Sequence, residues 1–259
     1  MSMRDWTRES LYRLLYLAGG EGSGVRVNLL YHSIGTASPH SVPELLFERQ
    51  MKLLAERFEI VRLCDWPKVI SEDRTAANIA CVTFDDGYRD NYEVALPVLE
   101  RIGFKATFFI TTGLLGKTFH AASAEYPMMS EAHVRQLAAL GHEVAAHTIT
   151  HPKLTRVALE KATAEVQGSK CFLEDLLGSG IVSFAYPKGD YNETVKALVR
   201  ESGFSFAVTV RQGMVDGHLD WLALPRVWIS SQINKKGFAA RMSPATERYQ
   251  RIRQRLRLG

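Results

Sequence analysis

Cysteine is scarce in this sequence. The 259 residues include three cysteines, Cys64, Cys81 and Cys171, and no two of them form a Cys-x-x-Cys pair. An odd and scattered set of this kind predicts neither a disulfide scaffold nor a cysteine-based zinc site. Three thiols in a reducing compartment are the better interpretation.

Long hydrophobic runs are also missing. No apolar stretch is long enough to cross a bilayer, so no transmembrane helix is expected. The N-terminus makes a poor signal peptide, because Asp5, Arg8, Glu9 and Arg13 interrupt it and Leu14–Ala18 is too short for the apolar region. We therefore expect a protein of the cytoplasm or of the inner face of the membrane.

The net charge of +4 is unevenly distributed. Residues 235–259 contain eight Lys or Arg and one acid, Glu247, so this segment carries +7 and residues 1–234 carry −3. Within Glu247–Leu258, Tyr249, Ile252 and Leu256 fall near one face of a predicted helix. Such a basic amphipathic helix can lie on an anionic membrane, together with the short helix predicted over Thr7–Ala18. A solvated terminal helix is the alternative, and no motif supports nucleic-acid binding.

Apolar runs of strand length alternate with helical patterns along the rest of the chain. Alternation of this kind implies a parallel sheet with right-handed crossovers, and seven or eight units fit one (β/α) barrel. We expect an N-terminal helix and joint at residues 1–24, one catalytic barrel at 25–234 and a basic tail helix at 235–259. The predicted strands are Val25–Tyr31, Glu59–Leu63, Ile79–Phe84, Ala106–Thr111, Glu143–Ala146, Ile181–Tyr186, Phe204–Val210 and Leu224–Ile229, and the predicted helices are Pro43–Phe58, Asn91–Ile102, Ser130–Leu140, Leu154–Leu177 and Asn192–Ser202.

Two adjacent carboxylates follow the third predicted strand. Asp85 and Asp86 come directly before Gly87 and Tyr88. Burying two unpaired carboxylates is costly, and a metal ion bound by one of them removes much of that cost while the other acts as a base. A solvated Asp-Asp-Gly turn is the alternative interpretation.

Two histidines follow the strand Glu143–Ala146. His147 and His151 are four residues apart, so their imidazoles can face one ion if the segment makes a helical turn. The pair alone is weak evidence, since such spacing also arises between ordinary surface or core histidines. Together with Asp86 it would make a two-histidine, one-carboxylate set with open positions for water and substrate.

A loop rich in Pro and Gly follows the strand Ile181–Tyr186. Pro187, Lys188 and Gly189 predict a rigid turn whose exposed N–H groups can stabilise an oxyanion, although an ordinary loop would look the same.

Together these segments resemble the polysaccharide deacetylases with a NodB homology domain, carbohydrate esterase family 4. The resemblance rests on TFDDGY at Thr83–Tyr88, HTITHP at His147–Pro152 and FAYPKGDYN at Phe184–Asn192, and it covers residues 25 to 230. It implies a deformed (β/α) barrel that removes acetyl groups from N-acetylated polysaccharides or oligosaccharides. It also implies that Asp85 is the catalytic base, that Asp86, His147 and His151 bind zinc (or cobalt or nickel), and that the Lys188 amide completes the oxyanion hole.

The sequence departs from the family pattern at two points. No histidine occurs after His218, so the late general acid of many members is missing, and Ala185 stands where an arginine often orients the base. Arg226 is our candidate to replace that arginine. His32 is the candidate acid or substrate contact, a structural histidine being the alternative, and His218 is a weaker one.

Aromatic side chains near the strand ends suit stacking on sugar faces or packing in the barrel. Tyr88, Tyr191 and Trp221 are the candidates. Four other functions compete with sugar deacetylation: deformylation, cyclic-amide hydrolysis, sugar binding by a catalytically weak relative, and non-haem iron oxygenation. The paired aspartates and the His-x-x-x-His spacing disfavour the last.

Overall fold

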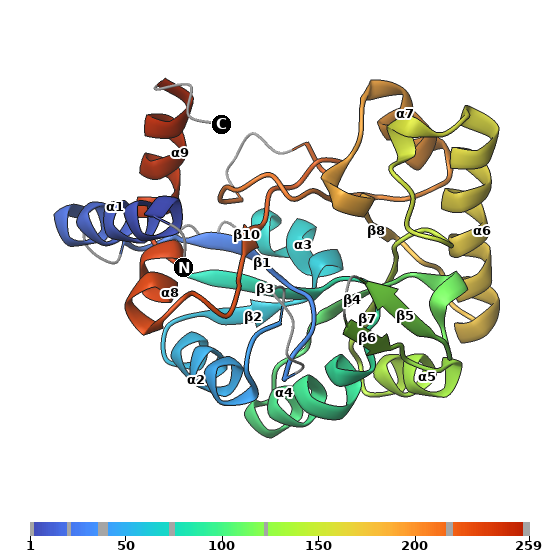
Figure 1. Cartoon of the computed structure of the whole chain (residues 1–259), viewed down its shortest axis with the longest axis horizontal. Coiled ribbons are helices and arrows are strands. Elements are labelled where there is room, and N and C mark those ends of the chain that lie inside the picture. The colour runs from blue at the N-terminus through green and yellow to red at the C-terminus, as the bar shows by residue number, and fades with distance from the viewer. Residues whose placement is uncertain are drawn as a thin grey trace.

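A curled parallel sheet forms the centre of the molecule (Figure 1). The computed structural model describes residues 3–19, 22–35, 41–72, 76–121, 124–215 and 220–255. Within them the strand order is β10-β1-β3-β4-β7-β8-β9, and β2 pairs with the first half of β3. The strands are β1 Arg26–Tyr31, β2 Glu59–Val61, β3 Ile79–Phe84, β4 Thr107–Ile110, β7 Glu143–Ala146, β8 Ser183–Ala185, β9 Phe206–Val208 and β10 Val227–Trp228.

The two edges of this sheet are joined by the segment that precedes β10. The Leu224 N–H donates to the Ala207 carbonyl at 2.9 Å, and the Thr209 N–H donates to the Leu224 carbonyl at 3.0 Å. Three residues after Leu224, β10 begins and pairs in parallel with β1. This short, irregular connection is what deforms the barrel, and it confirms the predicted single-domain α/β architecture.

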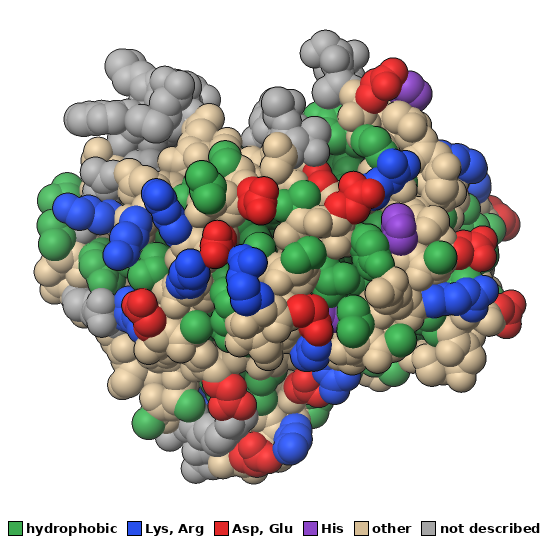
Figure 2. Space-filling view, turned by 90° about the horizontal axis from the view of Figure 1, so that it is seen from below, with side chains coloured by type: hydrophobic (Ala, Val, Ile, Leu, Met, Phe, Trp, Pro, Cys, Tyr) green, Lys and Arg blue, Asp and Glu red, His purple; other side chains and the backbone are tan. Residues whose placement is uncertain are grey.

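Helices cover the outside of the sheet, with α2, α4 and α5 along one side and α6 and α7 along another (Figure 1). Side-chain caps begin two of them, since Ser130 accepts from the His133 N–H and Asn192 accepts from the Val195 N–H. Over the face of α2, α4 and α5, acidic, basic and apolar side chains are intermixed (Figure 2). The bounds are α2 Glu44–Ala55, α3 Trp66–Ser71, α4 Leu96–Ile102, α5 Glu131–Ala139, α6 Leu159–Leu177 and α7 Glu193–Glu201.

Three features of the barrel differ from the sequence prediction. The hairpin of β5 (Thr118–Ala121) and β6 (Ala124–Pro127) and the short helix α3 were not anticipated. The helix expected over Asn91–Ile102 begins as a π-helical segment, Asn91–Ala95, before continuing as α4. The widened turn coincides with the buried Asn91 amide donating to the His32 carbonyl at 2.7 Å.

The terminal segments pack against each other. Helix α1 (Met3–Gly19) contacts α8 (Lys235–Arg241) and α9 (Ala245–Arg255). The Tyr12 ring stacks on the Tyr249 ring with centroids 4.3 Å apart, and the Arg241 guanidinium lies over the Tyr12 ring at 4.6 Å. Residues 235–255 therefore form two packed helices where one tail helix was expected, and Leu256 lies outside the described residues. No helix in the described ranges is both long and apolar enough to cross a membrane.

Candidate active site

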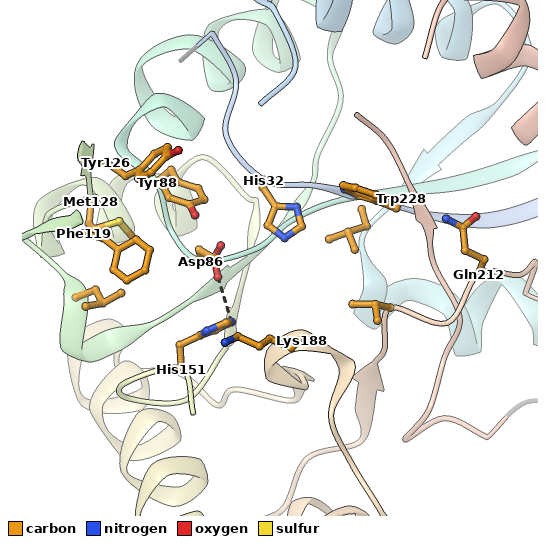
Figure 3. A pocket seen from close by; sticks show the side chains of 13 residues that line it. His32, Asp86, Tyr88, Phe119, Tyr126, Met128, His151, Lys188, Gln212 and Trp228 are labelled. Carbon is orange, nitrogen blue, oxygen red and sulfur yellow. Dashed lines mark ion pairs between the residues drawn. The ribbon is translucent and has the colours of Figure 1, made fainter. Parts of the chain in front are cut away.

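The carboxyl ends of the strands surround a cavity of about 540 Å³. Its polar lining comes from loops after β1, β3, β7, β8 and β9 (Figure 3). Because parallel strands end at the same edge, motifs far apart in the sequence meet here. The polar side chains that line the cavity include His32, Asp86, Tyr88, His151, Lys188 and Gln212.

Asp86, His147 and His151 form a cluster fit for a metal ion. Their ligand atoms all lie within 4.8 Å of one another, and Asp86 Oδ1 is 3.5 Å from His147 Nε2 and 3.4 Å from His151 Nε2. The buried His147 donates its Nδ1–H to the Ala185 carbonyl at 2.8 Å, which leaves Nε2 as the coordinating atom. Burial, and then the neighbouring His147, lower the pKa of His151 to about 4, so this imidazole is neutral at pH 7. Two imidazole nitrogens and one carboxylate oxygen are a donor set that zinc accepts.

The backbone around this cluster is strained. The non-glycine residues with positive φ among those described are Asp86, Thr148, His151 and Lys188, at 73°, 65°, 60° and 59°. Each such residue costs free energy and persists only where its surroundings impose it. All four belong to the three strand-end motifs, so the strain is confined to the site.

Glu165 of α6 imposes the conformation of the loop after β7. Its buried carboxylate accepts the N–H groups of Ile149 and Thr150 at 2.9 and 2.7 Å, and the Thr150 hydroxyl at 2.6 Å. Thr148 completes the loop by accepting the His151 N–H at 3.0 Å. Sequence reasoning missed Glu165, although a charged residue on the buried stripe of α6, between Ala162 and Ser169, was the available signal.

Asp85 lies beside the cluster and is held by Arg226. The guanidinium Nη1 and Nη2 donate to the two carboxylate oxygens, each at 2.6 Å. Arg226 is fully buried and Asp85 is 3% exposed. Burial alone would raise the pKa of Asp85, but the charge and hydrogen bonds of Arg226 hold it below its ordinary value. Asp85 is thus an ionised carboxylate of fixed orientation.

Arg226 is itself held by the barrel. Its Nε donates to the Thr209 carbonyl at 2.9 Å and its Nη1 to the Thr83 hydroxyl at 3.1 Å, and its guanidinium lies over the Phe109 ring. Its full burial places Arg226 behind the base and away from the cavity lining. These contacts fit the role considered for Arg226, that of the arginine missing at position 185.

His32 follows β1 and faces Asp86 across the cavity (Figure 3). Its carbonyl accepts from Asn91, and the Ser33 hydroxyl next to it donates to Asp90 at 2.5 Å. The π-helical segment therefore positions the loop that carries this imidazole. His218, the weaker candidate, lies outside the described residues.

The loop after β8 brings Lys188 to the cavity wall. Gly189 donates to the Tyr186 carbonyl at 2.8 Å, which is the first hydrogen bond of the 3-10 turn Pro187–Gly189, so the Lys188 N–H precedes the hydrogen-bonded part of that turn. A Cβ on Gly189 would lie 2.4 Å from Val210 Cγ2, so glycine is needed for this close approach. Pro187, the first residue of this turn, is buried and does not line the cavity.

Aromatic residues fall into two groups. Tyr88 lines the cavity, where burial and the nearby Asp86 carboxylate raise the pKa of its hydroxyl. Tyr191 stacks on Tyr186 at 4.8 Å, and Trp221 packs edge-on against Phe206 at 5.6 Å. The last two, predicted as sugar platforms, thus pack within the barrel instead of lining the cavity.

The β5–β6 hairpin, absent from the sequence prediction, supplies the rest of the aromatic wall. Its Tyr126 ring lies 5.4 Å from Tyr88 and 6.4 Å from Phe119, and Leu114 and Met128 continue this wall. An isolated Met129 N–H to Gly87 carbonyl bond at 2.9 Å ties the hairpin to the loop of the aspartates.

Comparison with known proteins gives consistent results. Residues 72–207 match the family model described as polysaccharide deacetylase. The Bacillus subtilis protein YxkH, named for this same family, is 28% identical over 214 residues, covering 82% of this chain and 74% of that protein. A poly-beta-1,6-N-acetyl-D-glucosamine N-deacetylase of Staphylococcus aureus is 22% identical over 202 residues, covering 74% of this chain and 68% of that protein. The solved structure of the Streptococcus pyogenes deacetylase PplD in complex with acetate matches with a TM-score of 0.75 at 25% identity, covering 86% of this chain and 100% of that one.

Proposed function

The chain belongs to the polysaccharide deacetylase family, hydrolases that act on carbon–nitrogen bonds, and from that premise we propose that it is a metal-dependent N-deacetylase. Its proposed substrate is an N-acetylated sugar within a bacterial-type surface polysaccharide or its lipid-linked precursor. The relative in Staphylococcus aureus is named for such a polymer, and PplD was solved with acetate, the product expected here.

One observation carries this proposal. An ionised, immobilised base, Asp85, stands beside a separate cluster of three metal-binding side chains at the floor of an open cavity. A sugar-binding module has no use for a base held in this way. A catalytically weak relative was considered because the late general acid and the arginine that orients the base are missing. Arg226 supplies the second of these two contacts.

Asp86, His147 and His151 would hold the divalent ion, and zinc, cobalt or nickel suits their nitrogen and oxygen donors. When bound, such an ion supplies a Lewis acid that polarises the amide carbonyl and acidifies water.

The chain's own residues supply the proton transfers. Asp85 accepts the proton of the attacking water on a carboxylate oxygen, and Arg226 fixes the direction from which it does so. The Lys188 N–H donates to the oxyanion that develops on the substrate, an interaction that typically lowers a barrier by about 3 to 4 kcal/mol. His32, at the cavity wall, gives a proton to the leaving amine.

Acetate release tests the proposal directly. The purified protein, loaded with Zn²⁺, Co²⁺ or Ni²⁺, is incubated with N-acetylglucosamine oligomers, and acetate is measured. We expect Asp85→Asn to abolish turnover while retaining the metal, and His147→Ala to lose both. Full activity of Asp85→Asn would contradict the mechanism, and failure of the wild type to bind any divalent ion would contradict the enzyme assignment. Formate release from N-formyl sugars, or ring opening of a cyclic amide, without acetate release would point to the related hydrolytic functions.

We further propose that α1 and α9 rest weakly on an anionic membrane surface. Leu14 and Leu17 of α1 are 63% and 79% exposed, and Arg251 and Arg255 of α9 are exposed as well. Tyr249, expected on the membrane-facing side of α9, is stacked on Tyr12, so the apolar contribution comes from α1. A lipid-linked substrate would make this attachment useful.

Liposome flotation tests the attachment. We expect the protein to float with vesicles containing anionic lipid at low salt and to dissociate as salt is raised. The double variant Leu14→Ser/Leu17→Ser should lose this binding. It is a better probe than deletion of residues 235–259, because α8 and α9 pack on α1. Equal flotation of the variant and the wild type would contradict the proposal.

A further inference from the structure

The cavity extends to both sides of the metal-binding cluster. On one side lies the apolar wall of Phe119, Tyr126 and Met128, and on the other the lining continues past His32 to Trp228 and Gln212 (Figure 3). A cavity of about 540 Å³ is far larger than an acetyl group needs. The space next to Trp228 and Gln212 is therefore available to a part of the substrate that does not react.

Gln212 has a polar atom that the fold leaves unused. Its side-chain oxygen Oε1 is buried, and it has no hydrogen-bond partner among the described residues. Buried acceptors are nearly always paired, because an unpaired one loses its water without compensation. An unpaired acceptor in the wall of a substrate cavity indicates that a donor on the ligand completes it.

The loop that carries Gln212 is held from both sides. The Arg226 N–H donates to the Arg211 carbonyl at 2.9 Å, and the Met214 N–H donates to Glu247 Oε1 at 2.7 Å. The only acid of residues 235–259 thus supports the cavity wall from α9. This anchoring fixes the backbone on both sides of Gln212, which reduces the entropy lost when a ligand binds there.

We propose that Gln212, together with the ring of Trp228, forms a subsite for the sugar unit next to the one that is deacetylated. A hydroxyl or acetamido N–H of that unit donates to Gln212 Oε1, and a face of the sugar lies against Trp228. The inference rests on the proposed function, and it makes the protein an enzyme of oligomers and polymers, for which single sugars are poor substrates. The apolar wall across the cavity offers few donors or acceptors for sugar hydroxyls, which favours the Gln212 side for this unit.

Chain-length dependence tests the subsite. The ratio of kcat/KM for N-acetylglucosamine pentamers to that for the monosaccharide is measured, with β-1,4- and β-1,6-linked pentamers. We expect a ratio well above one for the wild type and a fall of about fivefold in Gln212→Leu, the scale of one lost hydrogen bond. Gln212→Glu keeps the acceptor and should keep the ratio. Gln167→Leu, an exposed glutamine on α6, is the matched control for the surface change.

Direct binding separates this proposal from the proposed function. Calorimetric titration of each pentamer into the zinc-loaded protein requires no turnover. Weaker binding to Gln212→Leu, with thermal unfolding like that of the wild type, supports the subsite even if no acetate is released from any substrate. Equal chain-length ratios and equal affinities in Gln212→Leu and the wild type would overturn it, as would a wild type that binds neither pentamer.

Discussion

Arg226 and Asp85 are 141 residues apart in the sequence and meet through two hydrogen bonds of 2.6 Å each. Arg226 comes from the segment that closes the barrel, and Asp85 follows strand β3 in the interior of the sheet. The segment that closes the sheet therefore also supplies the side chain that orients the base.

Replacement of Arg226 by Met should damage both activity and stability. Removing one partner of a buried pair leaves an uncompensated charge, which typically costs about 3 to 5 kcal/mol of unfolding free energy. We expect kcat/KM for acetate release to fall roughly 100-fold or more, the scale of general-base catalysis. Arg226→Lys should recover little, because an ammonium cannot donate to both oxygens in a fixed plane. Urea unfolding and initial rates give the two measurements.

A double variant separates these effects. Asp85→Asn combined with Arg226→Met removes both charges, so its stability should exceed that of Arg226→Met alone while activity stays absent. If the double variant is no more stable than Arg226→Met, the stability loss comes from packing and not from the orphaned carboxylate.

Removal of Glu165 should weaken metal binding without touching a ligand. Its carboxylate holds the N–H groups of Ile149 and Thr150 within the strained loop between the two histidines. Loss of such supporting contacts typically costs roughly 10- to 100-fold in metal affinity. We expect that loss in Glu165→Ala, measured by competition with a zinc chelator. Lys161→Met removes only the ion pair that the exposed Lys161 makes with Glu165, and this variant should bind zinc normally. Equal affinities in the two variants would refute this role for Glu165.

Gly113, in the turn that follows β4, contacts the loop between the two histidines. Its N–H donates to the Ile149 carbonyl at 2.8 Å, and a Cβ there would lie 2.5 Å from that oxygen. Gly113→Ala should therefore displace the loop, lower the unfolding free energy by about 1 to 3 kcal/mol and reduce zinc affinity. Gly180→Ala is the control, because its nearest atom would be 3.9 Å away. Unchanged zinc affinity in Gly113→Ala would show that the loop tolerates the shift.

Much of the sheet was predictable because each strand is an apolar run, and the site followed because its motifs begin where those runs end. β3 and β7 have the predicted bounds, and the residues of the metal cluster meet as expected. The family resemblance left the base without its arginine, and Arg226, the candidate to replace it, does contact Asp85. The contacts of Glu165 were not predictable, since they join distant segments. A charge on the buried stripe of α6 marked Glu165 as unusual, but that pattern does not indicate which groups it contacts. The hairpin Thr118–Pro127 has no strong alternation to mark it.

Glu143 provides a pH-dependent prediction at the opposite end of the barrel from the site. Its buried carboxyl accepts from the Thr107 and Ser183 hydroxyls at 2.8 and 2.5 Å and from the Cys64 N–H at 3.1 Å. Burial nevertheless holds its pKa above the ordinary glutamate value, with Arg62 opposing. The thiols nearby, Cys64 and Cys81, do not titrate below pH 8, because burial raises their pKa values too.

The sign of the effect follows from proton binding. Between the ordinary glutamate pKa and the raised pKa of folded Glu143, the folded protein binds more protons than the unfolded chain, so the free energy of unfolding falls as pH rises. Glu143→Gln removes this titration and keeps a side chain of the same shape. We expect the stability of the wild type relative to Glu143→Gln to decrease with rising pH across that window and then to level off, as measured by urea unfolding between pH 4 and pH 8. A difference that is constant with pH, or that grows with it, would show that the three donors outweigh burial and keep Glu143 ionised in the folded protein.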